Sequence, residues 1–235
     1  ISFSKRNIVE FNYIKNVLLT KDDGGGIYAA SAGSYPNAAT AGSIIRNNIV
    51  DGVFGTLEGW DTWILRGGHG IFLDENGGGV TIENNIVANC TGTCVFLHKS
   101  FNETIKNNLL FNARRGFAIN QDLGGSQFKN NIIYVLKKDI DNKGIEYLVS
   151  KYQGNVEINY NTYISHYNST NVFMLEEVKS YDFTGWKTVT GQDANSTIDL
   201  SPLSIGDTEE LFYNDTKQTK LFNLGSSIYK DIYGN

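Results

Sequence analysis

The chain has 235 residues, of which 40% are hydrophobic, and a formal net charge of -5. This length and apolar content suffice for a substantial core, and the acidic balance argues against nucleic acid or an anionic membrane as a partner. No apolar run reaches the length needed to span a bilayer, so a membrane is not expected as a partner in that way either.

An Asn-Asn pair followed by two aliphatic residues recurs along the chain. The clear copies are Ile45–Val50, Ile82–Val87, Ile105–Leu110 and Phe128–Ile133, and weaker copies are Val9–Ile14 and Ile158–Tyr163. The second Asn of each copy lies at positions 12, 48, 85, 108, 131 and 161, which gives intervals of 36, 37, 23, 23 and 30 residues. The shortest interval defines the repeating unit, and the longer intervals contain insertions.

Each unit predicts one coil of a parallel β-helix. Its short alternating segments are rich in Val, Ile, Phe and Thr and are broken by Asn and Gly, which is typical of strands and turns. Repeats of this length bury their apolar faces by stacking on their neighbours. Because Asn tolerates the left-handed backbone region, the second Asn can turn inward and bond to its counterpart about 4.8 Å away in the next coil. The sequence therefore predicts an all-β parallel β-helix with a structural Asn ladder.

A second set of segments repeats in phase with the Asn pairs and predicts one strand in four consecutive coils. The aligned segments are Gly26–Ala30, Gly70–Asp74, Cys94–His98 and Gly116–Asn120. Period-two alternation directs one set of side chains inward: Ile27, Ile71, Val95, Phe117, Ala29, Leu73, Leu97 and Ile119. The outward face is expected to carry a small column (Gly26, Gly70, Cys94, Gly116), an aromatic column (Tyr28, Phe72, Phe96, then Ala118) and a polar column (Ala30, Asp74, His98, Asn120).

The repeat assigns residues 1–170 to the coils. The chain begins within a coil, so we expect further coils upstream. Residues 171–203 form an exit segment, with a short helix predicted over Phe173–Lys179 because it contains good helix formers. Residues 204–235 are predicted to form a C-terminal β cap or the start of a β module. Cys90 and Cys94 are interpreted as small semi-buried thiols, with a local disulfide as the alternative in an oxidising compartment.

Two insertions flank the outward strand and predict a cleft. Residues 31–43 follow Tyr28 and residues 51–69 precede Phe72, and long loops on a regular scaffold are commonly functional. The expected floor is Tyr28, Phe72 and Phe96, and the expected rim is Tyr35, Trp60 and Trp63. Such aromatic faces suit sugar rings, although the tryptophans could instead anchor their own loop.

Carboxylates collect at the same place: Asp22, Asp23, Asp74 and Glu75. Glycosidases use two carboxyl groups about 5 Å apart for retention or roughly 6.5 to 9.5 Å apart for inversion. Along a straight strand Asp23 and Asp74 would be separated by up to about 23 Å. Either Gly24–Gly26 curls Asp23 over the groove, or the working group is Asp74, Glu75 and His98. As alternatives, the carboxylates cap turns and the histidines are ordinary groove residues.

Basic residues also approach this face: Arg66, Lys99, Arg114 and Arg115. They could bind an acidic sugar or provide the base of a lyase, or they could be solvated surface charges. No cofactor is required, but a Ca²⁺ ion could use the oxygen-rich set of Asp22, Asp23, Asp74 and Glu75.

Several motifs resemble the right-handed parallel β-helix proteins of the pectin-lyase-like superfamily, in particular carbohydrate-active members such as glycoside hydrolase family 141. The motifs are Asp23–Tyr28, Asn47–Val50, Gly68–Asn76 and Val95–His98, and Trp186–Ser196 resembles the segment with which many of these exported proteins leave the helix. The resemblance covers most of residues 5–200. It implies a secreted or periplasmic bacterial enzyme acting on glycans, with two acidic catalysts at the positions of Asp23 and Asp74.

The leading hypothesis is a glycoside hydrolase with Asp74 and Asp23 as the acid and the nucleophile or base. Glu75 and His98 would tune or replace them. The expected substrate-binding residues are Tyr28, Tyr35, Trp60, Trp63, Phe72, Phe96, Arg66, His69, Arg115 and Asn120. The alternatives are a polysaccharide lyase with Lys99, Arg115 or His98 as the base, and a non-catalytic glycan-binding adhesin or tail-spike protein. In each case the expected partner is a carbohydrate.

Overall fold

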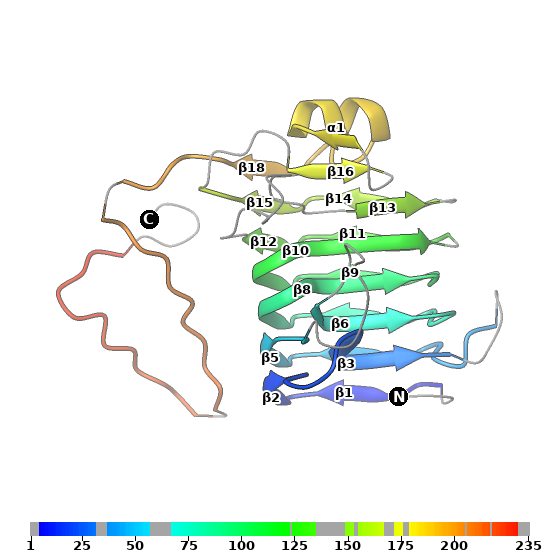
Figure 1. Cartoon of the computed structure of the whole chain (residues 1–235), viewed down its shortest axis with the longest axis horizontal. Helices are drawn as coiled ribbons and strands as arrows, with labels where there is room; N and C mark the ends of the chain where they lie inside the picture. Colours follow the sequence, from blue (N-terminus) through cyan, green and yellow to red (C-terminus); the bar gives the residue numbers. More distant parts are fainter. Residues whose placement is uncertain are drawn as a thin grey trace.

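The computed structural model of the chain describes residues 5–31, 37–56, 67–122, 124–134, 149–152, 155–166, 172–175, 179–204, 206–216 and 218–229. These residues form a stack of β coils with one short helix at its C-terminal end (Figure 1). The predicted all-β parallel β-helix is confirmed, since every strand pair in the stack is parallel except for one pair at that end.

The strands form two sheets that run along the stack. The six-stranded sheet contains, in order, β1 (Ile8–Glu10), β4 (Ile44–Arg46), β7 (Thr81–Glu83), β9 (Thr104–Lys106), β11 (Gln127–Lys129) and β14 (Glu157–Asn159). The 12-stranded sheet contains β2 (Tyr13–Val17), β3 (Gly24–Ala30), β5 (Ile49–Val53), β6 (Gly68–Asp74), β8 (Ile86–His98), β10 (Leu109–Asp122), β12 (Ile132–Tyr134), β13 (Val149–Tyr152), β15 (Thr162–Ile164), β16 (Phe173–Leu175), β17 (Lys179–Tyr181) and β18 (Thr197–Asp199).

Two long strands join what were expected to be separate short strands. β8 and β10 have 13 and 14 residues and pair in parallel over most of their length, with a register shift between Ala113 and Arg115. The first part of β8 pairs with β5 and the last part with β6. One long strand therefore contributes to two sides of its coil.

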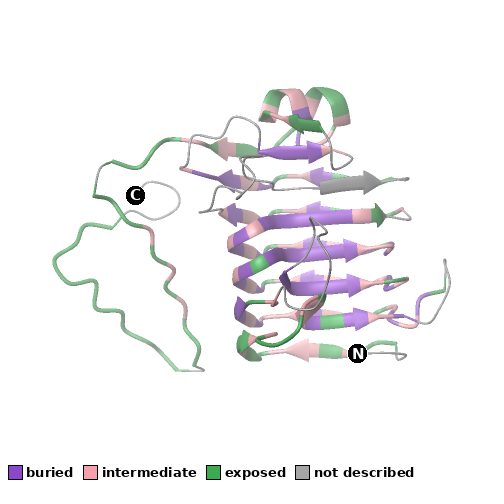
Figure 2. Ribbon diagram, in the orientation of Figure 1, coloured by how far each residue is buried: buried purple, intermediate pink, exposed green. Residues whose placement is uncertain are grey.

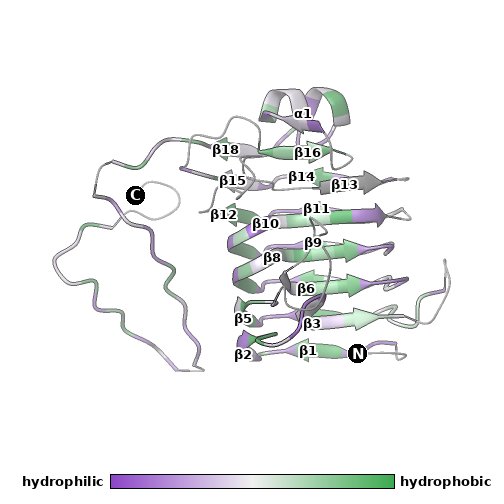
Figure 3. Cartoon of the chain, in the orientation of Figure 1, coloured by the Kyte–Doolittle hydropathy of each residue, from purple (hydrophilic) through white to green (hydrophobic). Residues whose placement is uncertain are grey.

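The interior of the stack is apolar, as predicted from the alternation. All eight side chains expected to point inward from the repeated strand belong to one core cluster. The buried residues concentrate in the stacked strands (Figure 2), where hydrophobic residues also gather (Figure 3).

An Asn ladder runs through the stack, as predicted. Each Nδ2 donates to Oδ1 of the next ladder residue at 2.9 to 3.1 Å, along the series Asn12, Asn48, Asn85, Asn108, Asn131 and Asn161. The same Oδ1 atoms also accept the backbone N–H of the preceding ladder residue. At the end of the series the Asn161 N–H donates to Ser196 Oγ at 2.8 Å.

The left-handed residue is the first of each pair rather than the second. Asn47, Asn84, Asn107 and Asn130 have φ between 54° and 57°, and so does Phe11 in the first weak copy. The positive φ at the first position turns the chain so that the following Asn points inward. The ladder prediction was therefore right about the inward residue and wrong about which residue makes the turn.

The small column faces the core, contrary to the prediction that it faces outward. A Cβ added at Gly70 would lie 2.1 Å from Val87 Cγ1, and one at Gly116 would lie 2.2 Å from Ile133 Cγ2. Cys94 in the same column is 1% exposed and belongs to the core cluster. At this bend of the coil two consecutive residues point inward, so simple alternation fails.

Cys90 and Cys94 are both free and buried, so the structure contains no disulfide between them.

The helix lies later in the chain than predicted. Phe173–Leu175 and Lys179–Tyr181 are the antiparallel strands β16 and β17, and residues 176–178 lie outside the described part. Phe173 is fully buried, so packing overrides the local helix propensity. The helix α1 spans Phe183–Thr190, and the side chain of its N-cap Asp182 accepts from the Gly185 N–H.

Among the described residues no helix has the length and apolar character needed to cross a membrane.

A buried carboxyl closes the C-terminal end of the stack. Asp193 accepts hydrogen bonds from Trp186 Nε1 at 2.8 Å, from Ser196 Oγ at 2.6 Å and from the Tyr163 hydroxyl. Burial raises the pKa of Asp193, and these hydrogen bonds only partly offset that effect. The segment resembling an exit from the helix thus ties α1 to the last rung of the ladder.

The C-terminal segment runs beside the stack in its described part, and the β cap or β module stays a prediction. Within 200–204, 206–216 and 218–229 there is no helix or strand, and Figure 1 shows this segment passing along the coils toward β2. Residues 209–213, which we call the strap, alternate between half-buried and exposed, with Glu209, Leu211 and Tyr213 half-buried. The Tyr213 hydroxyl donates to Asp51 Oδ2 at 2.6 Å, and Glu209 accepts from Tyr134. The strap therefore connects coils that do not touch each other directly.

Replacing a ladder residue should destabilise the protein strongly. Asn108→Ala would leave the buried Asn85 N–H without its acceptor and would remove the side-chain bonds that Asn108 forms with Asn85 and Asn131. Unsatisfied buried groups cost about 1 to 3 kcal/mol each, so chemical denaturation should show a loss of roughly 3 kcal/mol. Asn107→Gly is the matched control, because Asn107 is exposed at φ 57°, which glycine adopts freely. Equal losses in both variants would contradict the structural role of the ladder.

Removing the Tyr213 hydroxyl should loosen the strap. Tyr213→Phe abolishes the hydrogen bond to Asp51, so amide hydrogen exchange at residues 209–213 should become faster, with a loss of about 1 kcal/mol in unfolding free energy. Tyr160→Phe is the control, since Tyr160 is 53% exposed on the turn between β14 and β15. Unchanged exchange in Tyr213→Phe would show that the strap is held by other contacts.

Candidate active site

The outward face of β3, β6, β8 and β10 carries three columns of side chains. Parallel register aligns β3 with β6, β6 with β8 and β8 with β10. The first column is Gly25, His69, Thr93 and Arg115; the second is Tyr28, Phe72, Phe96 and Ala118; the third is Ala30, Asp74, His98 and Asn120. The second and third columns match those expected from the sequence, whereas the first replaces the small column.

Asp74 is the centre of a hydrogen-bonded cluster at the edge of this face. Its Oδ2 accepts from the Tyr28 hydroxyl at 2.6 Å. Its Oδ1 lies 2.7 Å from His98 Nδ1 and accepts from the Glu75 N–H at 2.9 Å. These contacts join three neighbouring coils, because Tyr28, Asp74 and His98 lie on β3, β6 and β8.

The environment of Asp74 favours its ionised form. Burial acts to raise the pKa of Asp74, but hydrogen bonds from His98, Tyr28 and the Glu75 N–H outweigh burial and lower it. An ionised carboxylate only accepts hydrogen bonds, so the proton between the two side chains must lie on His98 Nδ1. In the neutral ring this leaves the His98 Nε2 lone pair available as a base, held in orientation by Asp74.

Tyr28 is held as a protonated phenol. Burial is the largest influence that raises the pKa of Tyr28, followed by its bond to Asp74 and by the negative charges of Asp74, Asp23 and Glu75. Its side chain is 38% exposed and packs edge-on against Phe72, with ring centroids 5.2 Å apart. Of the three carboxylates, Asp74 contacts the Tyr28 hydroxyl, whereas Asp23 and Glu75 influence its pKa through their charge.

The other predicted acids occupy different positions around the cluster. Glu75 is exposed and forms an ion pair with Lys99 at 2.8 Å rather than meeting His98. Asp23 is exposed and turns the chain itself with φ 53°, while Gly24–Gly26 lie inside β3 and do not form a curl. Asp22 accepts from the Gly67 N–H at 2.9 Å, just before β6.

Among the described residues no group of three or more His, Cys, Asp or Glu side chains is placed to hold a metal ion.

His69 is buried at the other edge of the same face. It is 2% exposed, and its Nδ1 accepts from the Thr93 N–H at 3.1 Å. Burial first, and then the positive charge of Arg115, lower the pKa of His69 to about 3, against an opposing influence of Asp74. His69 is therefore neutral near pH 7, with its proton on Nε2. Thr93 was not singled out from the sequence, although extending the in-phase alignment toward the N-terminus would have placed it beside His69.

The aromatic floor is more enclosed than predicted. Phe72 is 1% exposed and Phe96 is 5% exposed, so neither ring offers an open face for stacking on a sugar. They stack on each other at 4.8 Å and pack against His69 at 5.1 and 4.6 Å. The sequence shows that these rings share a column but carries no information on what covers them. Tyr28 is the member of the column with an exposed ring.

The remaining predicted residues divide into two groups. Arg115 is 1% exposed in the first column, and Asn120 is half-buried beside His98 in the third. Tyr35, Trp60, Trp63 and Arg66 lie outside the described residues, so their roles stay predictions. The insertion before β6 is shorter than expected, since Val53 still belongs to β5 and Gly68 and His69 to β6.

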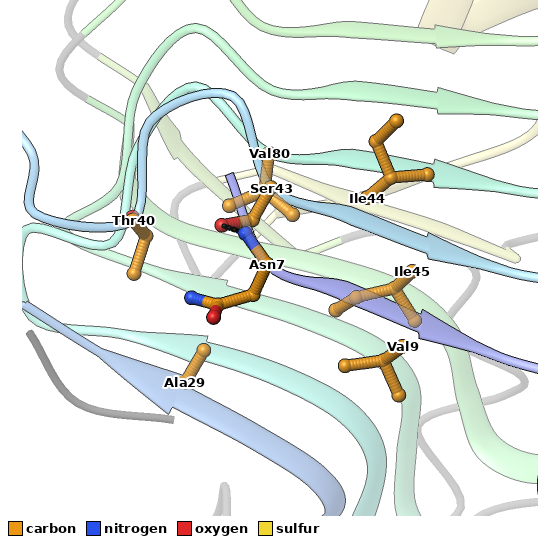
Figure 4. Close-up of a pocket in the computed structure, with 8 residues that line it drawn as sticks. All are labelled: Asn7, Val9, Ala29, Thr40, Ser43, Ile44, Ile45 and Val80. Carbon is orange, nitrogen blue, oxygen red and sulfur yellow. Dashed lines mark hydrogen bonds between the residues drawn. The ribbon is translucent and has the colours of Figure 1, made fainter. Parts of the chain in front are cut away.

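A small pocket lies away from this cluster, on the interior side of the stack near its N-terminal end. Figure 4 shows its lining residues, which are Asn7, Val9, Ala29, Thr40, Ser43, Ile44, Ile45 and Val80. Ala29 points inward from β3, so the pocket faces the core rather than the outward columns. None of the residues predicted for catalysis lines it.

Comparison with known families gives one match. A family model described as "Right handed beta helix region" matches residues 7–184. No curated protein and no solved structure matches the chain.

Acidification should destabilise the protein through His69. The folded state holds His69 neutral down to a pKa of about 3, whereas an unfolded His binds a proton below about pH 6.5, so stability falls as the pH drops between these values. At 1.36 kcal/mol per pH unit, lowering the pH from 6.5 to 4.5 should cost about 2 to 3 kcal/mol. The contribution is measured as the unfolding free energy of wild type minus that of His69→Gln. This difference should fall by about 2 to 3 kcal/mol between pH 6.5 and pH 4.5. A difference independent of pH would refute the buried neutral state.

Proposed function

This chain belongs to the right-handed β-helix family, and we propose that it cleaves glycosidic bonds by hydrolysis on the outward face of β3, β6 and β8. Fold alone does not define function, so the proposal depends on the site. The observation that carries it is the Tyr28–Asp74–His98 cluster, in which Asp74 bonds to the Tyr28 hydroxyl at 2.6 Å and lies 2.7 Å from His98 Nδ1. We also propose that the protein works outside the cytoplasm, as the resemblance to exported glycan-active proteins implies.

Hydrolysis requires one group that accepts a proton from water and another that gives a proton to the leaving oxygen. His98 Nε2 suits the first role because Asp74 fixes the ring and stabilises the imidazolium that forms. Asp74 itself does not suit the second role, since its pKa is lowered and both of its oxygens already accept hydrogen bonds. Asp74 thus becomes a positioning residue in this proposal, in place of the acid expected from the sequence.

Asp23 is the better candidate for the proton donor. Glu75 is already engaged in an ion pair with Lys99 at 2.8 Å. Asp23 is exposed and close enough for its charge to raise the pKa of Tyr28. In the proposed step, water attacks the anomeric carbon and transfers a proton to His98. Asp23 enters the step with a proton taken up from solvent, and it gives this proton to the departing oxygen as the glycosidic C–O bond breaks.

A polysaccharide lyase is the second candidate, and the orientation of His98 favours it. A single oriented base can abstract the proton next to a uronate carboxyl group and start β-elimination. An unsaturated product that absorbs ultraviolet light would identify this reaction, whereas hydrolysis releases reducing ends without that absorbance. Binding across a glycan panel without turnover would instead support the non-catalytic adhesin.

Asp74→Asn should abolish most activity without unfolding the protein. An amide removes the negative charge that stabilises the imidazolium, and its single oxygen can accept from only one of His98 and Tyr28, so the oriented base is weakened. We expect the rate of reducing-sugar release to fall by about 100-fold or more, in the range of general acid-base effects. Asp215→Asn, which makes the same chemical change at an exposed carboxylate paired with Lys220, is the control. Full activity in Asp74→Asn would contradict the assigned site.

A further inference from the structure

Asn120 lies directly beside His98 on the outward face of the coils. The two residues are register partners on β10 and β8, and both are half-buried. Neighbouring strands lie about 4.8 Å apart, so directly opposed side chains are within reach of each other. Asp74 on β6 bonds to His98 from the other side. His98 is therefore the middle member of a row of three polar side chains from consecutive coils.

The side-chain amide of Asn120 is not used by the scaffold. Its backbone carbonyl accepts the Lys99 N–H at 2.8 Å, but none of the described residues forms a hydrogen bond with the amide itself. The ladder amides differ in this respect, since they bond from coil to coil. An amide side chain has two N–H donors and an oxygen that accepts. The Asn120 amide is thus open to a water molecule or a ligand beside His98.

The free nitrogen of His98 is turned away from Asp74. His98 Nδ1 lies 2.7 Å from Asp74 Oδ1, and the ring plane is 7° from that of Phe96. The two nitrogens of an imidazole ring point in widely different directions, so a ring with Nδ1 toward β6 directs Nε2 away from β6. Asn120 is on the strand at the other side of β8. The base and the open amide therefore border the same part of the face.

Resting on the proposed hydrolysis, we propose that Asn120 Oδ1 and His98 Nε2 together hold the attacking water. Two hydrogen bonds of about 2.8 Å through one water span up to roughly 5.6 Å, which covers the strand spacing of about 4.8 Å. A water that donates both of its protons has its lone pairs free for the anomeric carbon. Asn120 would thus orient the nucleophile before it reacts.

The two protons of this water have different fates. As the new C–O bond forms, the proton that faces His98 moves to Nε2. The proton that faces Asn120 stays on the oxygen and remains in the product as part of the new anomeric hydroxyl group. Asn120 therefore gains and loses no proton, and its contribution depends only on the acceptor oxygen.

The charged neighbours suit other roles. The ammonium group of Lys99 binds Glu75 at 2.8 Å and keeps two further N–H groups, but it can only donate, so it cannot take the second proton of the water in a hydrogen bond. Asp74 faces the other ring nitrogen of His98. Asn120 supplies an acceptor on the side of the base that Asp74 leaves open.

Two substitutions of nearly equal size test whether the acceptor oxygen matters. Asn120→Asp keeps an acceptor and loses the N–H groups, whereas Asn120→Leu loses both. kcat and KM would be measured on whichever of xylan, laminarin, polygalacturonate, alginate and chitosan the wild type cleaves fastest, each variant at its own pH optimum. We expect kcat to fall by about 10- to 100-fold in Asn120→Leu and by less than about threefold in Asn120→Asp, with KM nearly unchanged in both. Asn195→Leu, on the exposed turn before β18, is the control and should match wild type.

The other outcomes would overturn the inference in distinguishable ways. A raised KM with an unchanged kcat in Asn120→Leu would assign Asn120 to sugar binding. Equal losses of kcat in both variants, with circular dichroism showing that both fold, would assign the effect to the N–H groups. An ultraviolet-absorbing product from wild type would show elimination, which uses no water, so the inference would fail while glycan cleavage stood. Absence of turnover on all of these polysaccharides would overturn the proposed function and the inference with it.

Discussion

Hydrogen bonding between successive coils is the constraint on which this structure depends. The backbone pairs of the two sheets and the buried amides of the Asn ladder repeat the same contacts at every step of the stack. A shift of one residue in any coil would break the ladder there and turn inward side chains outward. Since Asn oxygens accept two N–H groups at each step, the ladder fixes the register as well as contributing stability.

This register produces the candidate site. Tyr28, Asp74 and His98 come from three coils and are far apart in sequence, yet parallel stacking brings them within hydrogen-bond distance. The resulting cluster combines an ionised carboxylate, a protonated phenol and an oriented imidazole. On the opposite edge of the same face, burial keeps His69 neutral. Two histidines one coil apart thus have different environments, since His69 is buried and His98 is half-buried with its Nδ1 against Asp74.

Two features outside the repeated coils hold parts of the stack together. At the C-terminal end Asp193 joins α1, Tyr163 and Ser196 beneath the last ladder residue. The strap then crosses the coils and bonds to Asp51 on β5, 162 residues from Tyr213. In a solenoid each coil contacts mainly its neighbours, so such a crossing adds a long-range connection that nearest-neighbour stacking lacks.

The sequence by itself determined the coil repeat, the Asn ladder and the membership of the aromatic and polar columns, because these features depend on local alternation and on a constant period. Only the tertiary structure decided the rest. The inward turn of Gly70 and Cys94 depends on the bend of the coil, and the strand at Phe173 depends on core packing that overrides helix propensity. The burial of Phe72 and the lowered pKa of Asp74 depend on contacts with distant residues. Periodicity fixes which residues share a face, whereas the protonation and exposure of each side chain depend on the neighbours that three-dimensional packing places around it.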